Sequence, residues 1–273
     1  MSGFSPEWLA LREPADHAAI NAQVRLELVR VLAGKASPKV VDLGCGAGSN
    51  LRGLSPWLPA GQSWTLVDYD QRLLDAAQAR VARSPLSPSP REGGGTSVTY
   101  RQADFSAGDF APLIAGADLV TAAALFDLVS VPVIGKLADA VTANRQIFCT
   151  VLTYDGIASF LPEHPLDRAM REAFNRHQQT DKGFGPAAGP NATEALAQAF
   201  TSRGYRVIRA KSPWVLDQTF ERLRRELDQG WANAVRETGA VPVREIEGWI
   251  AHRLAAQDAV TVVGHEDLLA VPV

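Results

Sequence analysis

The sequence predicts an α/β protein with a doubly wound, seven-stranded and mostly parallel sheet whose last strand runs antiparallel. Three observations lead to this prediction. Short apolar runs alternate with amphipathic segments at helical spacing. The early strands are apolar throughout, which is typical of a parallel sheet covered by helices on both faces. The final strand follows a helical segment, which favours an antiparallel return, and we also expect an N-terminal helix and helical cap insertions.

The first half of the chain alternates regularly between helices and strands. Apolar residues such as Leu73, Leu74, Ala77 and Val81 share one helical face, whereas the strands are short and uniformly apolar. In chain order we predict a helix over 15–33, a strand over 39–43, a helix over 49–56, a strand over 63–70, a helix over 71–84, strands over 98–105 and 118–125, a helix over 131–142 and a strand over 145–156. Residues 84–97, rich in Pro, Ser and Gly, are predicted to form a surface loop.

The second half is less regular. We predict a helix over 162–182, a helix over 191–204, a strand over 205–216, helices over about 217–236 and 243–258, and a final strand over 260–273. Asn191 is a suitable N-cap for the second of these helices, and Gly204 is a suitable stop.

Composition places the chain among ordinary globular proteins. It has 273 residues, of which 46% are hydrophobic and 21% charged, and we expect one domain over 1–273. The net charge is −3 and no dense Lys or Arg run is present, so we expect no nucleic-acid partner. The N-terminus lacks the pattern of a signal peptide, and the two cysteines lack a paired spacing. We therefore expect a cytoplasmic protein with no membrane association and no metal site.

A glycine-rich turn, "VVDLGCGAGSN" over 40–50, follows the first predicted strand. Gly44, Gly46 and Gly48 allow positive φ angles and close approach of the backbone to a ligand. The strand–turn–helix context places this turn at the carboxyl edge of the sheet, where such folds bind ligands. The third glycine is not where a nicotinamide dinucleotide motif requires it, because position 49 is Ser. Asp42 would repel a phosphate but would accept hydrogen bonds from an ammonium group, so the ligand should carry a cation.

With these motifs in order, the sequence resembles the class I, Rossmann-like S-adenosylmethionine-dependent methyltransferases. The resemblance rests on "VVDLGCGAG", on "LVDYD" at the end of the second strand and on "QADF" at the end of the third. It is clear over about the first 155 residues. It implies S-adenosylmethionine as the cofactor and methyl transfer as the reaction.

The resemblance also implies roles for individual residues. Asp68 follows Gly48 by 20 residues, at a strand end where a carboxylate can take both ribose hydroxyls. Asp104 would contact the adenine amino group, and Tyr69 and Phe105 would flank the ring. The expected cofactor-binding residues are Asp42, Gly44, Cys45, Gly46, Asp68, Tyr69, Asp104, Phe105 and Ala122. Asp70 is expected mainly to cap the following helix.

The catalytic residues are less clearly marked. After the fourth strand the chain reads "AAALFDLV", without the Asn- or Asp-Pro-Pro-Tyr loop of amino-group methyltransferases and without a nucleophilic cysteine. The remaining mechanism is direct displacement, in which the acceptor attacks the methyl group on the sulfonium sulfur. Tyr154, at the end of the fifth strand, and His177, in the segment that follows it, are the candidate catalytic residues.

The acceptor is expected to be a small molecule. Within the single domain we predict an N-terminal helical lid over 1–36, a cofactor-binding core over 37–154 and substrate-cap helices in the C-terminal part over 155–273. Mixed apolar and polar residues in the last of these are typical of a small-molecule pocket. Alternatives are a nucleic-acid or protein methyltransferase, a non-catalytic S-adenosylmethionine-binding module and, less favoured, an NAD-dependent oxidoreductase. The oligomeric state is not predicted.

Overall fold

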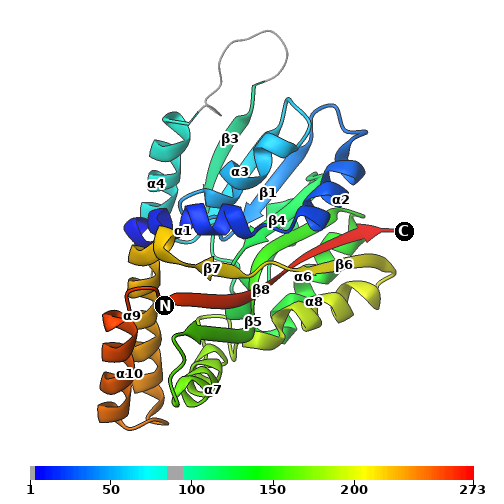
Figure 1. The fold of residues 1–273 in the computed structure, drawn as a ribbon. Coiled ribbons are helices and arrows are strands. Elements are labelled where there is room, and N and C mark those ends of the chain that lie inside the picture. The colour runs from blue at the N-terminus through cyan, green and yellow to red at the C-terminus, as the bar shows by residue number, and fades with distance from the viewer. Residues whose placement is uncertain (1–3, 85–94) are drawn as a thin grey trace.

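The fold is a central sheet with helices on both faces (Figure 1). The structure, a computed structural model, describes residues 4–84 and 95–273. Most of the loop predicted over 84–97 lies outside these residues. In the described part of the chain, no helix is long and apolar enough to cross a membrane.

The sheet confirms the predicted fold class. Its strands are β1 (Lys39–Leu43), β2 (Ser63–Asp68), β3 (Ser97–Gln102), β4 (Leu119–Ala123), β5 (Ile147–Leu161), β6 (Tyr205–Lys211), β7 (Trp214–Leu216) and β8 (Val260–Pro272). Their spatial order is β3-β2-β1-β4-β5-β8-β6, and β7 pairs with β8. The strands β1 to β5 are parallel, whereas β8 is antiparallel to β5, β6 and β7. The carboxyl ends of β1, β2 and β4 therefore meet at one edge.

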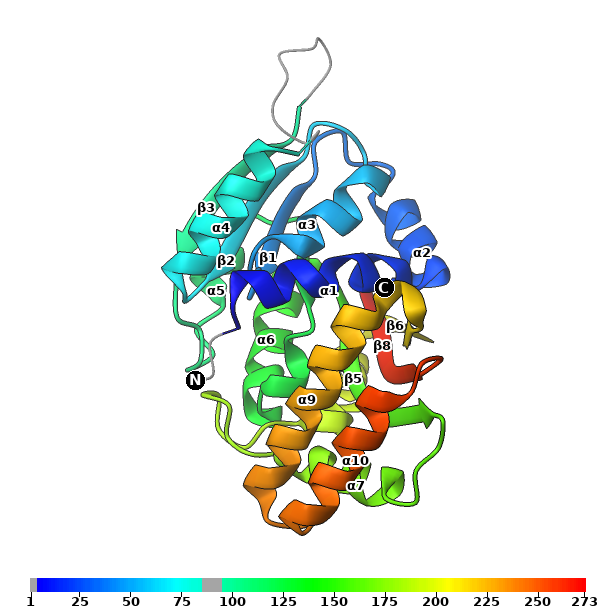
Figure 2. The same ribbon diagram turned by 60° about the vertical axis from the view of Figure 1, so that its left-hand side comes forward.

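The helices bury two separate apolar clusters against the sheet. They are α1 (Pro6–Ala19), α2 (Ala22–Leu32), α3 (Ser49–Leu54), α4 (Gln71–Ala82), α5 (Ala111–Ile114), α6 (Val131–Ala143), α7 (Asp167–Gln178), α8 (Ala192–Thr201), α9 (Glu221–Thr238) and α10 (Val243–Ala255). One cluster contains side chains of α2, α3, α4, α7, α9 and α10, and the other those of α5, α6 and α8. The helices α9 and α10 form an antiparallel pair at one end of the molecule, and α1 crosses the middle (Figure 2).

The prediction of one N-terminal helix over 15–33 was wrong. The structure has two helices, α1 and α2, separated at Ile20 and Asn21. Asn21 is extended and caps α2, since its side chain accepts hydrogen bonds from the amides of Gln23 and Val24. The apolar spacing continues across this break, and for that reason periodicity alone did not reveal it.

The strand predicted over 205–216 is divided into β6 and β7. Pro213, which has no amide hydrogen, follows Ser212 at the break. The hydroxyl of Ser212 donates to a carboxylate oxygen of Asp267 at 2.6 Å instead of facing solvent. Both parts continue along β8 in the same register, with Lys211 opposite Glu266 and Trp214 opposite Val263.

Asp267, fully buried on β8, joins three segments that are far apart in sequence. Besides Ser212, it accepts hydrogen bonds from the amide of Asn21 at 2.7 Å and from the amide of Leu152 at 2.8 Å. Leu152 has a φ of 60°, which is strained for a non-glycine residue, at an irregular point in the pairing of β5 with β8. The carboxylate therefore stabilises an unusual backbone shape at the centre of the sheet.

Asp267→Ala is expected to lower the free energy of unfolding by roughly 3 kcal/mol or more, because it leaves three donors without their acceptor. Urea unfolding of the full chain measures the change. Asp109→Ala, at an exposed position, is the matched control and should stay within about 0.5 kcal/mol of the parent. Equal unfolding midpoints for the two variants would contradict the role given to Asp267.

Candidate functional site

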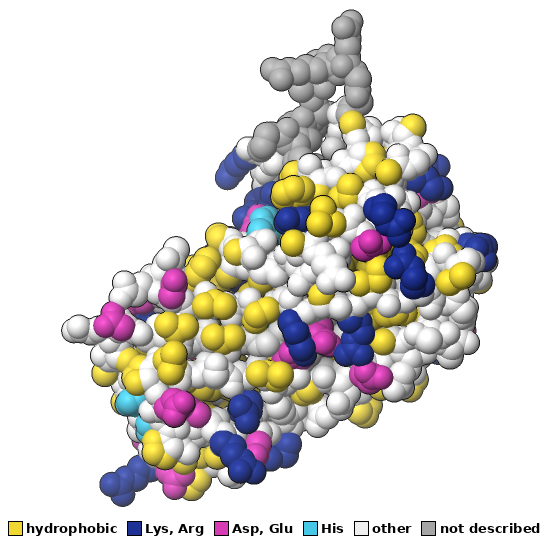
Figure 3. Space-filling view, turned by 45° about the vertical axis from the view of Figure 1, so that its right-hand side comes forward, with side chains coloured by type: hydrophobic (Ala, Val, Ile, Leu, Met, Phe, Trp, Pro, Cys, Tyr) yellow, Lys and Arg dark blue, Asp and Glu magenta, His cyan; other side chains and the backbone are white. Residues whose placement is uncertain are grey.

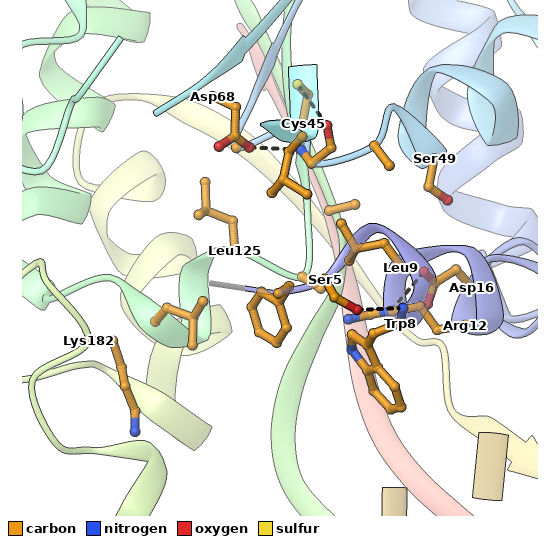
Figure 4. A pocket seen from close by; sticks show the side chains of 18 of the residues that line it. Ser5, Trp8, Leu9, Arg12, Asp16, Cys45, Ser49, Asp68, Leu125 and Lys182 are labelled. Atoms are coloured by element: carbon orange, nitrogen blue, oxygen red, sulfur yellow. Dashed lines mark hydrogen bonds and ion pairs between the residues drawn. The ribbon is translucent and has the colours of Figure 1, made fainter. Parts of the chain in front are cut away.

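A cavity of about 570 Å³ lies at the carboxyl edge of the sheet. Its walls come from the glycine turn, from the ends of β2 and β4, and from α1, α7 and α9. Figure 4 shows Asp68 and Cys45 on one side of the cavity and Trp8, Leu9 and Arg12 of α1 on another. Segments separated by more than 200 residues thus enclose one space.

The glycine turn has the backbone shape that its sequence predicts. Gly44, Gly46 and Gly48 have φ angles of 63°, 52° and 77°, in the left-handed region that favours glycine. A Cβ on Gly44 would lie 3.0 Å from the side chain of Leu125, and one on Gly46 would lie 3.0 Å from that of Leu9. The positive φ angles therefore favour glycine at both positions, and a Cβ there would also push the ends of the Leu125 and Leu9 side chains aside.

Asp42 is a fully buried carboxylate with one oxygen unused. Its Oδ1 accepts a hydrogen bond from Asn50 at 2.8 Å, whereas its Oδ2 has no partner. Burial raises the pKa of Asp42 to about 7; the bond from Asn50 opposes this shift, and the charge of Asp68 adds to it. Asp42 lines the cavity, so a cationic ligand there could supply the missing partner.

Asp68 joins the end of β2 to the glycine turn. The amide of Gly46 donates to its Oδ2 at 2.8 Å, and the amide of Asp70 donates to its Oδ1 at 3.0 Å. Burial raises its pKa, against the effect of these two amides. A carboxylate oxygen accepts more than one hydrogen bond, so both oxygens can still accept from ligand hydroxyls. Asp70 caps α4 as expected, accepting from the amide of Arg72.

The helix α1 covers the cavity and is fastened to the core by Glu13. The two carboxylate oxygens of Glu13 accept from Arg52 of α3 at 2.6 and 2.7 Å, and one of them also accepts from Arg80 of α4 at 2.6 Å. Burial acts to raise the pKa of Glu13, but the two arginines outweigh it and hold the pKa below its ordinary value. This ion pair is therefore present at neutral pH.

Most of the predicted cofactor-binding residues lie together in the wall of the cavity. These are Asp42, Gly44, Cys45, Gly46, Asp68, Tyr69 and Phe105, and His177 lies there too. Asp104, Ala122 and Tyr154 are not part of that wall. Asp104 is exposed and accepts a hydrogen bond from the amide of Ser106, and Ala122 is fully buried in β4 next to two alanines that do line the cavity.

The two candidate catalytic residues are already hydrogen-bonded to protein groups. The hydroxyl of Tyr154 donates to Asn175 at 2.7 Å, and burial raises the pKa of Tyr154 above its ordinary value. His177 Nε2 lies 3.0 Å from a carboxylate oxygen of Glu237, and Lys182 lies 3.4 Å from its other ring nitrogen. Tyr154 lines a second, smaller cavity rather than the main one.

Sequence reasoning predicted an N-terminal helical lid over 1–36 but named none of the residues of α1 that line the cavity. Its residues Trp8, Leu9, Arg12 and Asp16 line the cavity. The Arg12 guanidinium binds Asp16 through contacts of 3.0 to 3.2 Å and stacks on Trp214 at 4.8 Å. The four-residue spacing of Arg12 and Asp16 is a helical signal, but it does not indicate which element the pair will cover.

Comparison with known families agrees with this geometry. Residues 40–144 match the family model described as a methyltransferase domain. Over these residues the chain is similar to a methyltransferase domain. The match spans β1 to α6, and so includes the glycine turn and the ends of β2 and β4. No curated protein matches the chain.

Two solved structures share this fold at low identity, and a third is reported with them. The YcgJ protein of Bacillus subtilis has a TM-score of 0.50 and 11% identity, over 93% of this chain and 100% of that one. A putative methyltransferase of Bacillus halodurans has a TM-score of 0.50 and 13% identity, over 90% and 96%. A methyltransferase of Geobacter sulfurreducens, solved with S-adenosylhomocysteine, has a TM-score of 0.49 and 16% identity, over 98% and 99%.

Glu13→Gln is expected to loosen α1, because it removes a charge that binds two arginines. Amides of α1 should exchange with solvent roughly tenfold faster or more, which corresponds to the loss of charged hydrogen bonds. Hydrogen exchange followed by mass spectrometry of residues 5–19 measures this. Glu7→Gln, on the exposed face of the same helix, should leave exchange unchanged. If the two variants exchanged alike, Glu13 would not hold α1 in place.

Proposed function

We propose that this protein is an S-adenosylmethionine-dependent methyltransferase that transfers a methyl group to a small-molecule acceptor by direct displacement. The observation that carries the proposal is the buried, unpartnered oxygen of Asp42 in the cavity beside the glycine turn. A buried carboxylate oxygen without a donor is costly, and an ammonium group of a ligand relieves that cost. S-adenosylmethionine carries such a group.

The residues present fit this cofactor. Asp42 would receive its ammonium group, directly or through water, and the glycine turn leaves room for close approach. Asp68 would accept hydrogen bonds from the ribose hydroxyls. Phe105, buried, and Tyr69, 39% exposed, lie in the wall where an adenine ring needs aromatic faces. Asp104 lies outside the cavity wall. We propose that its exposed loop moves when the cofactor binds, so that Asp104 then contacts the adenine amino group.

The chain contributes position and exclusion of water to the reaction. Bound S-adenosylmethionine supplies an electrophilic methyl group on a sulfonium sulfur. The side chains of Trp8, Phe174 and Trp231 supply apolar walls, and α1 closes the space over them. Holding the acceptor in line with the methyl group can lower the barrier by on the order of 7–11 kcal/mol.

A small acceptor is supported by the helices that line the site and by the surface. The helices α1, α7 and α9 all contribute to the wall of the cavity beside the sheet edge. On the face shown in Figure 3, Lys and Arg side chains are scattered and commonly lie near Asp and Glu. We propose that 1–36 acts as the lid, 37–154 as the cofactor-binding core and 155–273 as the part that covers the acceptor.

Asp42→Asn is expected to weaken S-adenosylmethionine binding while stabilising the free protein at pH 8. Loss of a charged hydrogen bond of about 1.5–3 kcal/mol lowers affinity roughly tenfold to a hundredfold. The carboxylate has a pKa of about 7 when folded and near 3.8 when unfolded, so the folded state binds the extra proton between these values and loses stability as pH rises through them. Removing the charge should therefore add roughly 4 kcal/mol at pH 8, at about 1.4 kcal/mol for each unit between the two pKa values.

The same comparison at pH 5.5 is the internal control, because Asp42 is protonated there in the parent protein. The stabilisation by Asp42→Asn should fall to roughly half at that pH and vanish only near pH 4, because the carboxyl of the unfolded chain, with a pKa near 3.8, is still ionised at pH 5.5. Calorimetric titration measures binding, and urea unfolding at the two pH values measures stability. A variant that bound as tightly as the parent at pH 8, with the fold intact, would remove the basis for the proposed ammonium contact.

The small-molecule acceptor is tested by following a labelled methyl group. The purified protein is incubated with methyl-tritiated S-adenosylmethionine and a whole-cell extract, which is then separated into protein, nucleic acid and small-molecule fractions. Label should enter the small-molecule fraction, and the Asp42→Asn variant should transfer at least tenfold less at subsaturating cofactor. Transfer mainly to RNA or protein would show that the acceptor class is wrong, even if the cofactor is right.

A further inference from the structure

A second cavity of about 140 Å³ lies beside the first. The two share walls, among them Trp8, Arg12, Ala124 and Trp231, so the smaller cavity continues the larger one away from Asp42 and Asp68. It lies where the chain leaves β4. Ala124 has a φ of 49° there, a strained value of the kind that clusters at functional sites.

Asp127 is the charged residue in this second wall that has no opposite charge bound to it. Among the described residues, no side chain donates a hydrogen bond to its carboxylate, and the only amide acting on it is its own. Arg12, in the same wall, is already paired with Asp16 through two carboxylate oxygens. The cavity therefore keeps one uncompensated negative charge.

The other titratable groups that face Asp127 do not cancel this charge. Burial, with the nearby Arg12 charge, lowers the pKa of His265 to about 3, so the imidazole is neutral. Burial raises the pKa of Tyr154, which therefore stays protonated. Burial also raises the pKa of Asp127 to about 6, against its own amide and Arg12, so the carboxylate is ionised at neutral pH. Asp127 is half-buried and lines this cavity.

Much of the remaining wall is aromatic, beside aliphatic side chains such as Leu152 and Val263. Trp8, Phe174, Trp214 and Trp231 all lie in it, and the rings of Phe174 and Trp231 stack at 4.0 Å with an angle of 7°. Aromatic faces attract a cation, and a carboxylate attracts it more strongly. An anionic acceptor would be repelled by Asp127, and a neutral hydroxyl would gain no charge pairing.

We propose that the second cavity binds the methyl acceptor and that the acceptor is a small arylalkyl amine, held at its nitrogen by Asp127. This inference rests on the proposed function, which supplies the methyl donor. Asp127 pairs with the ammonium form and takes one proton from it. The nitrogen lone pair then forms the bond to the methyl carbon, and the carbon–sulfur bond breaks with its electron pair remaining on sulfur.

Matched ligands test the charge preference. Calorimetric titrations use protein saturated with S-adenosylhomocysteine and two amines, 2-phenylethylamine and tryptamine. Each is compared with its alcohol, 2-phenylethanol or tryptophol, and its acid, 3-phenylpropionate or indole-3-propionate. At least one amine should bind tenfold or more tighter than its alcohol, and the acids should bind most weakly.

Asp127→Asn should abolish this preference without changing S-adenosylhomocysteine affinity, and Asp109→Asn, exposed and outside both cavities, should change neither. Saturable binding of S-adenosylhomocysteine with no amine preference, or a preference that survives Asp127→Asn, would overturn the inference and leave the proposed function standing. Absence of S-adenosylhomocysteine binding would instead contradict the proposed function. The inference is supported if the parent protein and Asp109→Asn bind the amine more tightly than its alcohol and acid, and Asp127→Asn does not.

Discussion

The hydrogen bond from the Gly46 amide to the Asp68 carboxylate, 2.8 Å long, is the contact on which the site depends. The strands β1 and β2 are parallel neighbours, with Leu43 opposite Val67, so the turn after one strand must lie against the end of the other. Left-handed glycines make the turn tight enough to form this bond. As a result Asp42, just before the turn, is enclosed with one oxygen unpaired.

This arrangement places buried acids in the cavity wall. Their charges destabilise the free protein but are available to bind a ligand. The pKa values of Asp42 and Asp68 are both raised, chiefly by burial, which means that their charged forms are disfavoured until a ligand supplies donors. The helix α1 covers the same space and is held by the pairing of Glu13 with Arg52 and Arg80. The unpaired oxygen of Asp42 in the cavity favours a cationic ligand. The ion pairs of Glu13 hold α1 over that ligand.

The sequence predicted the core of the fold well because local pattern and tertiary role agree there. The strand β1 over 39–43, the cap at Asp70 and the antiparallel β8 follow from apolar runs and turn residues. The break at Asn21 was missed because the apolar spacing continues across it, and the contact of the Asn21 amide with Asp267 involves a residue 246 positions away. Arg12 and Asp127 were missed as site residues for a similar reason: they meet only when α1 and the segment after β4 pack together.

The most direct measurement is a calorimetric titration of the full chain at pH 8 with S-adenosylmethionine, repeated with methylthioadenosine, which lacks the aminocarboxypropyl chain with its ammonium group and also lacks the sulfonium charge. The account predicts one saturable site per chain for S-adenosylmethionine and binding of methylthioadenosine weaker by roughly tenfold or more, since Asp42 then gains no partner. Absence of saturable S-adenosylmethionine binding at millimolar concentration by folded protein, or equal affinity for the two ligands, would contradict it.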